Sequence, residues 1–255
     1  MKVENKTAII TGGASGLGEA TVRMLASKGA QVVVLDLNDA RGEALTEELG
    51  GNAVFIKADI TVSEQVQAAV DYTVQQFGRI DIVVNCAGIA PGMKIASKKG
   101  PHTLEVFAKT MEVNVIGPFN VMRLAADKML ANELNDEEGR GVIINTASIA
   151  AFDGQTGQVA YAASKAALVG MTLPAARDLS GDGIRICTIA PGLFKTPMMA
   201  GLPEKVQESL GKMVPFPSRL GNPQEFAMLV QQIIENPMLN GETIRLDGAI
   251  RLAAK

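Results

Sequence analysis

Cysteine and histidine are almost absent from this chain, and tryptophan is missing altogether. Its 255 residues include two cysteines, Cys86 and Cys187, and one histidine, His102. Two thiols cannot build a disulfide framework or a cysteine-rich zinc site. One imidazole cannot form a histidine cluster, so we expect no metal centre, and a Ser-His-Asp hydrolase would rest entirely on His102.

An excess of one charge and long apolar runs are also lacking. The 24 basic and 27 acidic residues give a formal net charge of −3, which argues against nucleic acid as a partner. No apolar run approaches the roughly 20 residues that span a bilayer. The first residues contain no apolar stretch of a signal peptide. We therefore expect a cytoplasmic protein with no membrane partner.

Short apolar runs alternate with amphipathic segments along the whole chain. The runs are continuous, which is typical of strands buried on both faces of a parallel sheet. They cover residues 7–10, 31–36, 54–56, 82–84, 142–144, 184–189 and 242–246. From Leu17 to Gly29, small or apolar residues recur with helical spacing. This alternation predicts a doubly wound α/β fold, with a seven-stranded parallel sheet, helices on both faces and a single domain over residues 1–255.

A glycine-rich loop joins the first predicted strand to the first predicted helix. Gly12 permits a tight turn, Gly16 lets the backbone approach a pyrophosphate, and Gly18 lets the helix and strand pack closely. The helix N-terminus adds free N–H groups and partial positive charge. A plain turn is the alternative, but the strand–loop–helix context favours a dinucleotide-binding loop.

Asp36 ends the second predicted strand, 18 residues after Gly18. A carboxylate at this place can accept hydrogen bonds from both ribose hydroxyls of adenosine, and it would repel a 2′-phosphate. We therefore expect NAD rather than NADP as the cofactor. An aspartate that caps a helix or a turn is the alternative.

Tyr161 and Lys165 are four residues apart, so a helix would place them on one face. A free phenol has a pKa near ~10, but a nearby ammonium and a positive nicotinamide ring would lower that pKa. Tyr161 could then exchange a proton with a substrate hydroxyl or carbonyl, while Ser148, after a predicted strand, donates to the substrate oxygen. Tyr-x3-Lys pairs are common on surface helices; the buried strand and the glycine-rich loop upstream favour the catalytic interpretation.

These motifs together resemble the short-chain dehydrogenase/reductase family over nearly the full chain. The glycine spacing, the run Asn85-Cys86-Ala87-Gly88 and the Tyr-x3-Lys pair carry the resemblance. It implies a Rossmann-type domain, and it implies Asn114 as a fourth catalytic residue beside Ser148, Tyr161 and Lys165. The NAD-binding residues that it implies are Gly12, Ser15, Gly16, Leu17, Gly18, Asp36, Asp59, Ile60, Cys86, Ala87, Gly88, Tyr161, Lys165, Pro191, Gly192, Phe194 and Thr196.

Several of these positions have other interpretations. Asp59 could instead cap a helix before Glu64. Cys86 is interpreted as a small buried residue against the cofactor rather than a nucleophile. Asn114, taken alone, would be an ordinary helix residue. Relatives that prefer NADP often carry a basic residue at the positions of Ser15 or Leu37, and this chain has none there.

Longer runs, among them residues 141–148, 188–194 and 239–251, resemble the 3-hydroxyacyl-CoA dehydrogenases of that family. The resemblance implies NAD-dependent oxidation of an L-3-hydroxyacyl-CoA to the 3-oxoacyl-CoA by a homotetramer. A steroid or other secondary-alcohol dehydrogenase is an alternative, as is a 3-oxoacyl-acyl-carrier-protein reductase, which Asp36 disfavours. A mainly structural subunit of a complex is a further alternative, against which the intact catalytic set argues.

Two irregular stretches, Gly88–Thr103 and Gly192–Pro217, follow predicted strands and should hang over the carboxyl edge of the sheet. In the first, Lys94, Lys98 and Lys99 could hold the phosphates of coenzyme A at the rim of the site, or they could be solvated. Lys195, in the second, departs from the smaller residue of relatives. The apolar residues of the second stretch could cover an acyl chain or pack against the core; they are Met198, Met199, Leu202, Leu210 and Met213.

Overall fold

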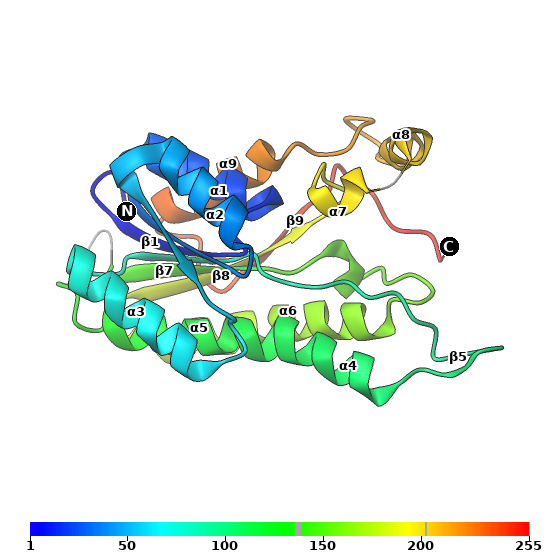
Figure 1. The fold of residues 1–255 in the computed structure, drawn as a ribbon, viewed down its shortest axis with the longest axis horizontal. Helices are drawn as coiled ribbons and strands as arrows, with labels where there is room; N and C mark the ends of the chain where they lie inside the picture. The colour runs from blue at the N-terminus through cyan, green and yellow to red at the C-terminus, as the bar shows by residue number, and fades with distance from the viewer. Residues whose placement is uncertain (136–138, 202, 255) are drawn as a thin grey trace.

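A parallel sheet of seven strands forms the centre of the molecule. The computed structural model describes residues 1–135, 139–201 and 203–254 (Figure 1). The strands lie in the order β3-β2-β1-β4-β7-β8-β9, and every neighbouring pair is parallel. They are β1 (Thr7–Thr11), β2 (Gln31–Asp36), β3 (Ala53–Lys57), β4 (Ile82–Asn85), β7 (Gly141–Thr146), β8 (Ile184–Pro191) and β9 (Thr243–Leu246). The predicted doubly wound fold is confirmed.

Helices cover both faces of this sheet. In Figure 1, α1, α2 and α9 lie above the sheet, whereas α3, α5 and α6 lie below it. The helices are α1 (Gly16–Ser27), α2 (Asp39–Leu49), α3 (Ser63–Phe77), α4 (Leu104–Met111), α5 (Gly117–Met129), α6 (Val159–Ser180), α7 (Pro197–Ala200), α8 (Glu204–Lys212) and α9 (Pro223–Glu235). The shorter elements are η1 (Gly50–Asn52), β5 (Ala96–Ser97), β6 (Gly100–Pro101), the π-helical turn η2 (Glu112–Ile116) and the 3₁₀ turn η3 (Ile149–Ala151).

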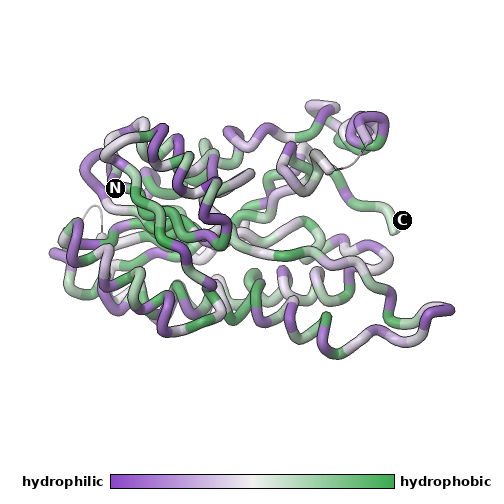
Figure 2. The backbone as a smooth tube through the Cα atoms, viewed as in Figure 1, coloured by the Kyte–Doolittle hydropathy of each residue, from purple (hydrophilic) through white to green (hydrophobic). Residues whose placement is uncertain are grey.

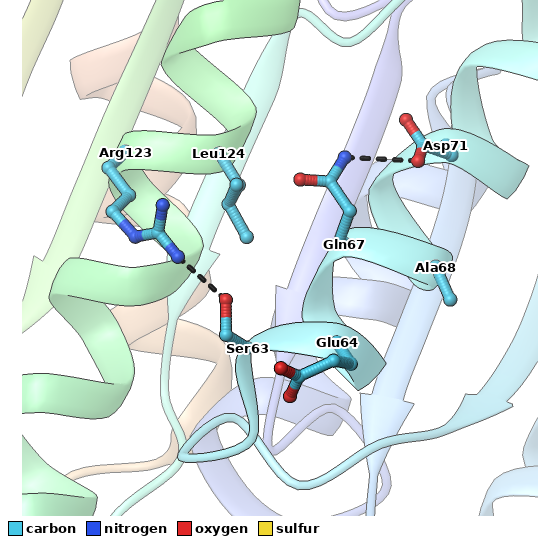
Figure 3. A pocket seen from close by; sticks show the side chains of 7 residues that line it. All are labelled: Ser63, Glu64, Gln67, Ala68, Asp71, Arg123 and Leu124. Carbon is cyan, nitrogen blue, oxygen red and sulfur yellow. Dashed lines mark hydrogen bonds between the residues drawn. The ribbon is translucent and has the colours of Figure 1, made fainter.

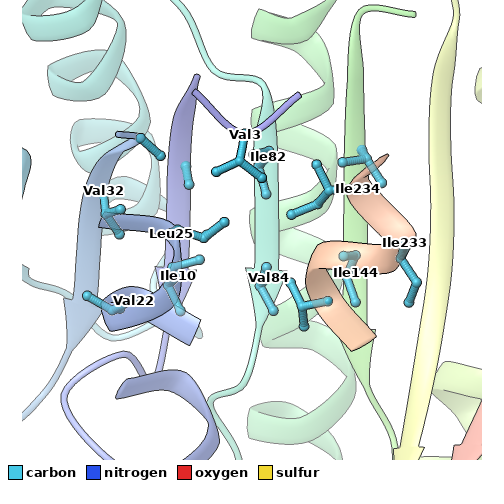
Figure 4. Close-up of a cluster of buried hydrophobic side chains, with 14 of the residues drawn as sticks. Val3, Ile10, Val22, Leu25, Val32, Ile82, Val84, Ile144, Ile233 and Ile234 are labelled. Atoms are coloured by element: carbon cyan, nitrogen blue, oxygen red, sulfur yellow. The ribbon is translucent and has the colours of Figure 1, made fainter. Parts of the chain in front are cut away.

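The continuous apolar runs are explained by two cores, one on each side of the sheet. In β1, Ile10 packs with Val22 and Leu25 of α1 in the upper core, which Figure 4 shows. The next residue along the strand, Ile9, points the other way and joins the lower core with Val70 of α3. Figure 2 shows the hydrophobic colour concentrated along the strands between the helical layers.

The strand order places a crevice at the carboxyl edge of the sheet. β1 lies between β2, on the side that continues to β3, and β4, on the side that continues to β7. Connections from β1 and β4 therefore leave in opposite directions and open a gap above their carboxyl ends. The glycine-rich loop follows β1, and residues 86–88 follow β4, so both reach this gap.

Helix α6 is the one helix, within the described part of the chain, that is long and apolar enough to cross a membrane by length and composition. The sequence expectation concerned uninterrupted apolar runs, and α6 contains none of that length, because Lys165, Arg177 and Asp178 interrupt it. The helix packs on β8, η3 and α4, and it buries polar residues such as Ser164 and Thr172. It covers the sheet, which accounts for its apolar character.

Candidate active site

The glycine-rich loop has the backbone that its glycines permit. Gly12 and Gly16 adopt positive φ angles of 62° and 55°, a region that favours glycine. A Cβ on Gly12 would lie 2.8 Å from the nitrogen of Ala87, and a Cβ on Gly18 would collide with the carbonyl oxygen of Gly12. The side chain of Ser15, the N-cap of α1, makes no capping hydrogen bond. The first turn of α1 therefore faces the crevice with N–H groups suited to phosphate.

Asp36 lies at the end of β2 beside this loop. Its carboxylate accepts a hydrogen bond from the nitrogen of Ala14 at 3.1 Å and from the nitrogen of Asn38 at 3.0 Å. The N-cap of α2 is Asn38, not Asp36. Arg41 donates through Nε to the carbonyl oxygen of Ala14 at 3.1 Å. No motif marks Arg41, which lies in the first turns of α2 and bonds to the same residue, Ala14, as Asp36 does.

Asp59 and Ile60 lie at the end of β3, on the same edge. Asp59 accepts hydrogen bonds from the backbone nitrogen and the hydroxyl of Thr61, at 2.9 and 2.7 Å. The backbone bond holds the pKa of Asp59 below its ordinary value. Helix α3 begins at Ser63 with Val62 as its N-cap, so the helix-cap alternative for Asp59 is wrong.

The segment after β4 is fixed by buried polar side chains. Thr11 accepts hydrogen bonds from the nitrogens of Cys86 and Ala87, at 3.2 and 3.3 Å. Asn85 donates to Asn145 at 2.9 Å. Burial raises the pKa of the Cys86 thiol to about 11, so the thiol is protonated and is not a nucleophile at neutral pH.

Ser148, Tyr161 and Lys165 meet where β7 gives way to η3 and α6. Lys165 donates from Nζ to the carbonyl oxygen of Thr146 at 2.8 Å, and Nζ lies 5.8 Å from the centre of the Tyr161 ring. Burial lowers the pKa of Lys165 to about 8. Burial also raises the pKa of Tyr161, against a hydrogen bond between Tyr161 and the Ser148 hydroxyl that lowers it. In the ligand-free protein the pKa of Tyr161 is thus shifted upward, because removal from water outweighs the Ser148 hydrogen bond. The lowering expected from a bound nicotinamide stays a prediction.

Asn114 stands behind this group, in the π-helical turn η2. Its amide donates to the carbonyl oxygen of Ile89 at 2.8 Å and to Ser164 at 3.0 Å, and its Oδ1 accepts from the nitrogen of Ile89 at 2.8 Å. A Cβ on Gly88 would lie 3.1 Å from this Oδ1 and 3.5 Å from Nζ of Lys165. Gly88 therefore lets Asn114 and Lys165 come close together. Asn114 does not line the cleft itself.

The crevice is a cleft of about 720 Å³ that brings the predicted residues together. All seventeen residues that the resemblance gave as cofactor-binding line it, and so does Ser148. Several further lining residues carry no motif in the sequence, because only the fold brings them there. They include Leu37, Ile89, Lys109, Gln155, Gln158, Leu193, Met199 and Leu252.

The lysines of the first irregular stretch lie elsewhere. Lys109 and Lys165 belong to the described lining of the cleft, whereas Lys94, Lys98 and Lys99 do not. Residues 96–101 form the β5–β6 hairpin, which Figure 1 shows projecting beyond α4. Lys98 and Lys99 lie in this hairpin, whereas Lys94 precedes it, next to Met93, whose nitrogen donates to the carbonyl oxygen of Gly157 at 2.8 Å. The three lysines are not part of the cleft wall, and their contact with coenzyme A stays a prediction.

The second irregular stretch borders the cleft only in part. Met199 lines it, but Leu210 and Met213 do not. Leu202 and the side chain of Met198 lie outside the described residues. Lys195 is exposed and lines a neighbouring hollow of about 520 Å³, which shares Gly16 and Thr196 with the cleft.

A further hollow between α3 and α5 offers no comparable chemistry. Figure 3 shows its seven lining residues, four of which form two hydrogen-bonded pairs. Gln67 donates to Asp71 at 3.0 Å, and Arg123 donates to Ser63 at 2.7 Å. The first contact lies within α3, and the second joins α5 to α3.

Comparison with known proteins agrees with this geometry. A sequence model of the short chain dehydrogenase family matches residues 6–207. The chain is 58% identical to the 3-hydroxyacyl-CoA dehydrogenase type-2 of Homo sapiens over 252 residues, 98% of this chain and 97% of the relative. It is 56% identical to the Drosophila melanogaster protein of the same name, over 98% of this chain and 99% of the relative.

A solved structure extends the likeness to three dimensions. The crystal structure of a 3-hydroxyacyl-CoA dehydrogenase type-2 from Mycobacterium avium is 43% identical and aligns with a TM-score of 0.95. The alignment covers 98% of both chains. The likeness in sequence and in structure thus extends over 98% of the chain, including the glycine-rich loop and the Ser148–Tyr161–Lys165 group. The protein belongs to the short-chain dehydrogenase family of oxidoreductases.

Proposed function

We propose that the protein oxidises L-3-hydroxyacyl-CoA to 3-oxoacyl-CoA with NAD, in a reversible reaction. The observation that carries the proposal is the Ser148–Tyr161–Lys165 group at the edge of a cleft that also contains Asp36. The substrate class comes from the relatives, which bear the name 3-hydroxyacyl-CoA dehydrogenase at 56% and 58% identity over nearly the whole chain.

The residues of the cleft fit a nicotinamide dinucleotide. The backbone of Gly12, Gly16 and Gly18 leaves room where side chains would stand, and the α1 N-terminus suits a pyrophosphate. Asp36 would hold the adenosine ribose and repel a 2′-phosphate, which favours NAD over NADP. Lys165 would hold the nicotinamide ribose. A nicotinamide held in this way would supply the acceptor for the hydride that the hydroxyl-bearing carbon of the substrate loses.

The proton is handled by this chain's own side chains. The Tyr161 phenolate takes the hydroxyl proton of the substrate, so that a C=O bond replaces the C–O single bond. The Ser148 hydroxyl donates to the substrate oxygen and steadies its charge. The Lys165 ammonium, held by Thr146, places positive charge 5.8 Å from the Tyr161 ring centre. Asn114 positions the Lys165 region through Ile89 and Ser164.

A substrate panel tests this function. We expect reduction of NAD in the presence of L-3-hydroxybutyryl-CoA, with little turnover of the D-enantiomer or of NADP. Turnover of a steroid alcohol but not of the thioester would favour a steroid dehydrogenase. Preference for NADP and an acyl-carrier-protein thioester would favour the reductase. Absence of turnover with every pair would favour a structural role.

We further propose that the protein is a homotetramer. On α6, Ala166 and Gly170 are exposed, so its small-residue face is open to a partner. Next to it, Ile116 and Phe119 are about half exposed, at 56% and 48%. Light scattering coupled to gel filtration measures the mass; a monomer at micromolar concentration would contradict this proposal and leave the proposed reaction untouched.

A further inference from the structure

The chain beyond β9 returns to the active site. After Asp247 the backbone runs beside the loop between η3 and α6, as Figure 1 indicates near the C-terminal end. The nitrogen of Thr156 donates to the carbonyl oxygen of Ala254 at 3.0 Å. Gln155 donates from Nε2 to the carbonyl oxygen of Ala253, also at 3.0 Å. Residues 247–254, the C-terminal tail, are therefore paired with the loop that follows Ser148.

Arg245 anchors the start of this tail. Its guanidinium donates to Asp153 at 2.6 Å, to Asp247 at 2.7 Å and to the carbonyl oxygen of Ile250 at 3.1 Å. It also lies 5.1 Å above the centre of the Phe152 ring. The side chains of Arg245 and Asp153 are both only 21% exposed, so this pair is better shielded from water than a surface ion pair. The tail is thereby fixed to residues 152–156 at both of its ends.

This fixation places Leu252 in the wall of the cleft. Leu252 lines the cleft together with Ile149 and Leu193, and the three side chains pack in one apolar cluster with Ile250. Arg251, the preceding residue, is tied to Asp247 and is mostly exposed. The side chain of Leu252 thus faces inward while its neighbour faces water.

The position of Leu252 along the cleft assigns it to the substrate end. Asp36 ends β2, on one side of β1, whereas Ile149 follows β7 and Leu193 follows β8, on the other side of β4. Leu252 therefore stands at the end of the cleft away from the adenosine site and beyond Ser148. An apolar side chain here meets the part of a substrate that extends past the reacting carbon.

Resting on the proposed function, we propose that the C-terminal tail closes the acyl pocket through Leu252 and limits the length of the acyl chain. Gln155, Thr156 and Arg245 hold the backbone of the tail, so Leu252 can leave the wall of the cleft only if the tail moves with it. A larger side chain at this position shortens the pocket, and a smaller one deepens it.

The test compares Leu252→Phe and Leu252→Ala with the wild-type enzyme on 3-hydroxybutyryl, 3-hydroxyoctanoyl and 3-hydroxydodecanoyl thioesters of coenzyme A. We expect Leu252→Phe to lower kcat/KM for the dodecanoyl substrate about tenfold while the butyryl value stays within about twofold. We expect Leu252→Ala to raise the dodecanoyl-to-butyryl ratio about threefold. The matched control is the same pair of substitutions at Leu104, which is 85% exposed and does not line the cleft.

The outcomes separate the two proposals. If both Leu252 variants change all three substrates by one common factor, or change none, the acyl-wall proposal is overturned while the proposed function stands. If the wild-type enzyme turns over no acyl-CoA, the proposed function fails and the acyl wall fails with it. Cofactor affinity, measured by titration calorimetry, should stay unchanged in both variants; a parallel loss would show general damage to the cleft and overturn the acyl wall.

Discussion

The ammonium group of Lys165 donates a hydrogen bond to the carbonyl oxygen of Thr146, at 2.8 Å, inside the wall of the cleft. The side chain is buried and burial lowers its pKa to about 8, so the charge is held at a cost in folding free energy. A residue required for chemistry is thus a candidate site of instability, as expected of a functional site that trades stability for activity.

We predict that Lys165→Met stabilises the ligand-free protein at pH 7 by roughly 2–3 kcal/mol, less any loss from the missing hydrogen bond. The folded protein releases the Lys165 proton near pH 8 and the unfolded chain near its ordinary value of 10.5. The free-energy cost of burying the charge is therefore fully present below pH 8 and vanishes above pH 10.5. The stabilisation by Lys165→Met should shrink between these two pH values. Urea unfolding of both proteins, below pH 8 and above pH 10.5, measures the difference in the free energy of unfolding. A variant that is less stable than the wild type at pH 7 would contradict the prediction.

The second prediction concerns Tyr161→Phe, which keeps the ring and removes the hydroxyl. We expect kcat to fall about a thousandfold, because only the proton-transfer group is lost. The cofactor dissociation constant, measured by titration calorimetry, should remain within about twofold. Substantial residual turnover would show that Tyr161 is not the base. Tyr72→Phe, on the exposed surface of α3, is the matched control.

The third prediction concerns the pH profile. Burial raises the pKa of Tyr161, so the fraction of the reactive phenolate grows with pH and oxidation should accelerate on the alkaline side. The hydrogen bond with Ser148 opposes this rise, so Ser148→Ala should move the alkaline limb of kcat/KM to higher pH. If the alkaline limb stays in place or moves to lower pH, it does not report the ionisation of Tyr161.

Cofactor choice supplies the fourth prediction. Asp36→Ala should raise the Michaelis constant for NAD about tenfold and narrow the preference over NADP, because the repelling carboxylate is gone. Arg41, bound to the carbonyl oxygen of Ala14, remains to meet a 2′-phosphate. Adding Arg41→Leu should therefore remove the improvement with NADP. Initial rates with both cofactors give the ratio, and Asp39→Ala, on an exposed ion pair, controls for charge alone.

The fifth prediction concerns the three lysines of the first irregular stretch. Replacing Lys94, Lys98 and Lys99 with alanine should leave the Michaelis constant for acyl-CoA within about twofold, since exposed charges away from a site contribute little. Measurements at low and high salt would reveal a long-range attraction. A several-fold increase in the Michaelis constant for acyl-CoA, seen at low salt but not at high salt, would show that these lysines approach the substrate in solution.

Local patterns predict the sheet well because each strand is buried on both faces. The run at 184–189 identifies β8, although the strand continues to Pro191. The hairpin that carries Lys98 and Lys99 is not predicted, because it depends on β5 pairing with β6, which two-residue strands hardly signal. Asn114 enters by family resemblance alone, since its role depends on Ile89 and Ser164.

The residues without motifs share one cause. Leu252 lies 91 positions after Tyr161 and reaches the same cleft only because β9 sits beside β8 and directs the tail back. Arg41, in α2, reaches Ala14 of the glycine-rich loop, 27 positions earlier in the chain. The upward shift of the Tyr161 pKa could not be predicted, because it depends on how completely the folded chain excludes water.

The π-helical turn at Glu112–Ile116 affects how α4 is rotated about its axis relative to α5. A π-helical turn contains about one residue more than an α-turn, so it offsets everything before it by roughly 100° around the axis. Helices α4 and α5 therefore share nearly one axis but not one angular register, and Asn114 stands at the offset. Deleting a single residue from this turn would restore a regular spiral and rotate α4 by that angle. The one extra residue in this turn therefore determines the direction in which the amide of Asn114 points.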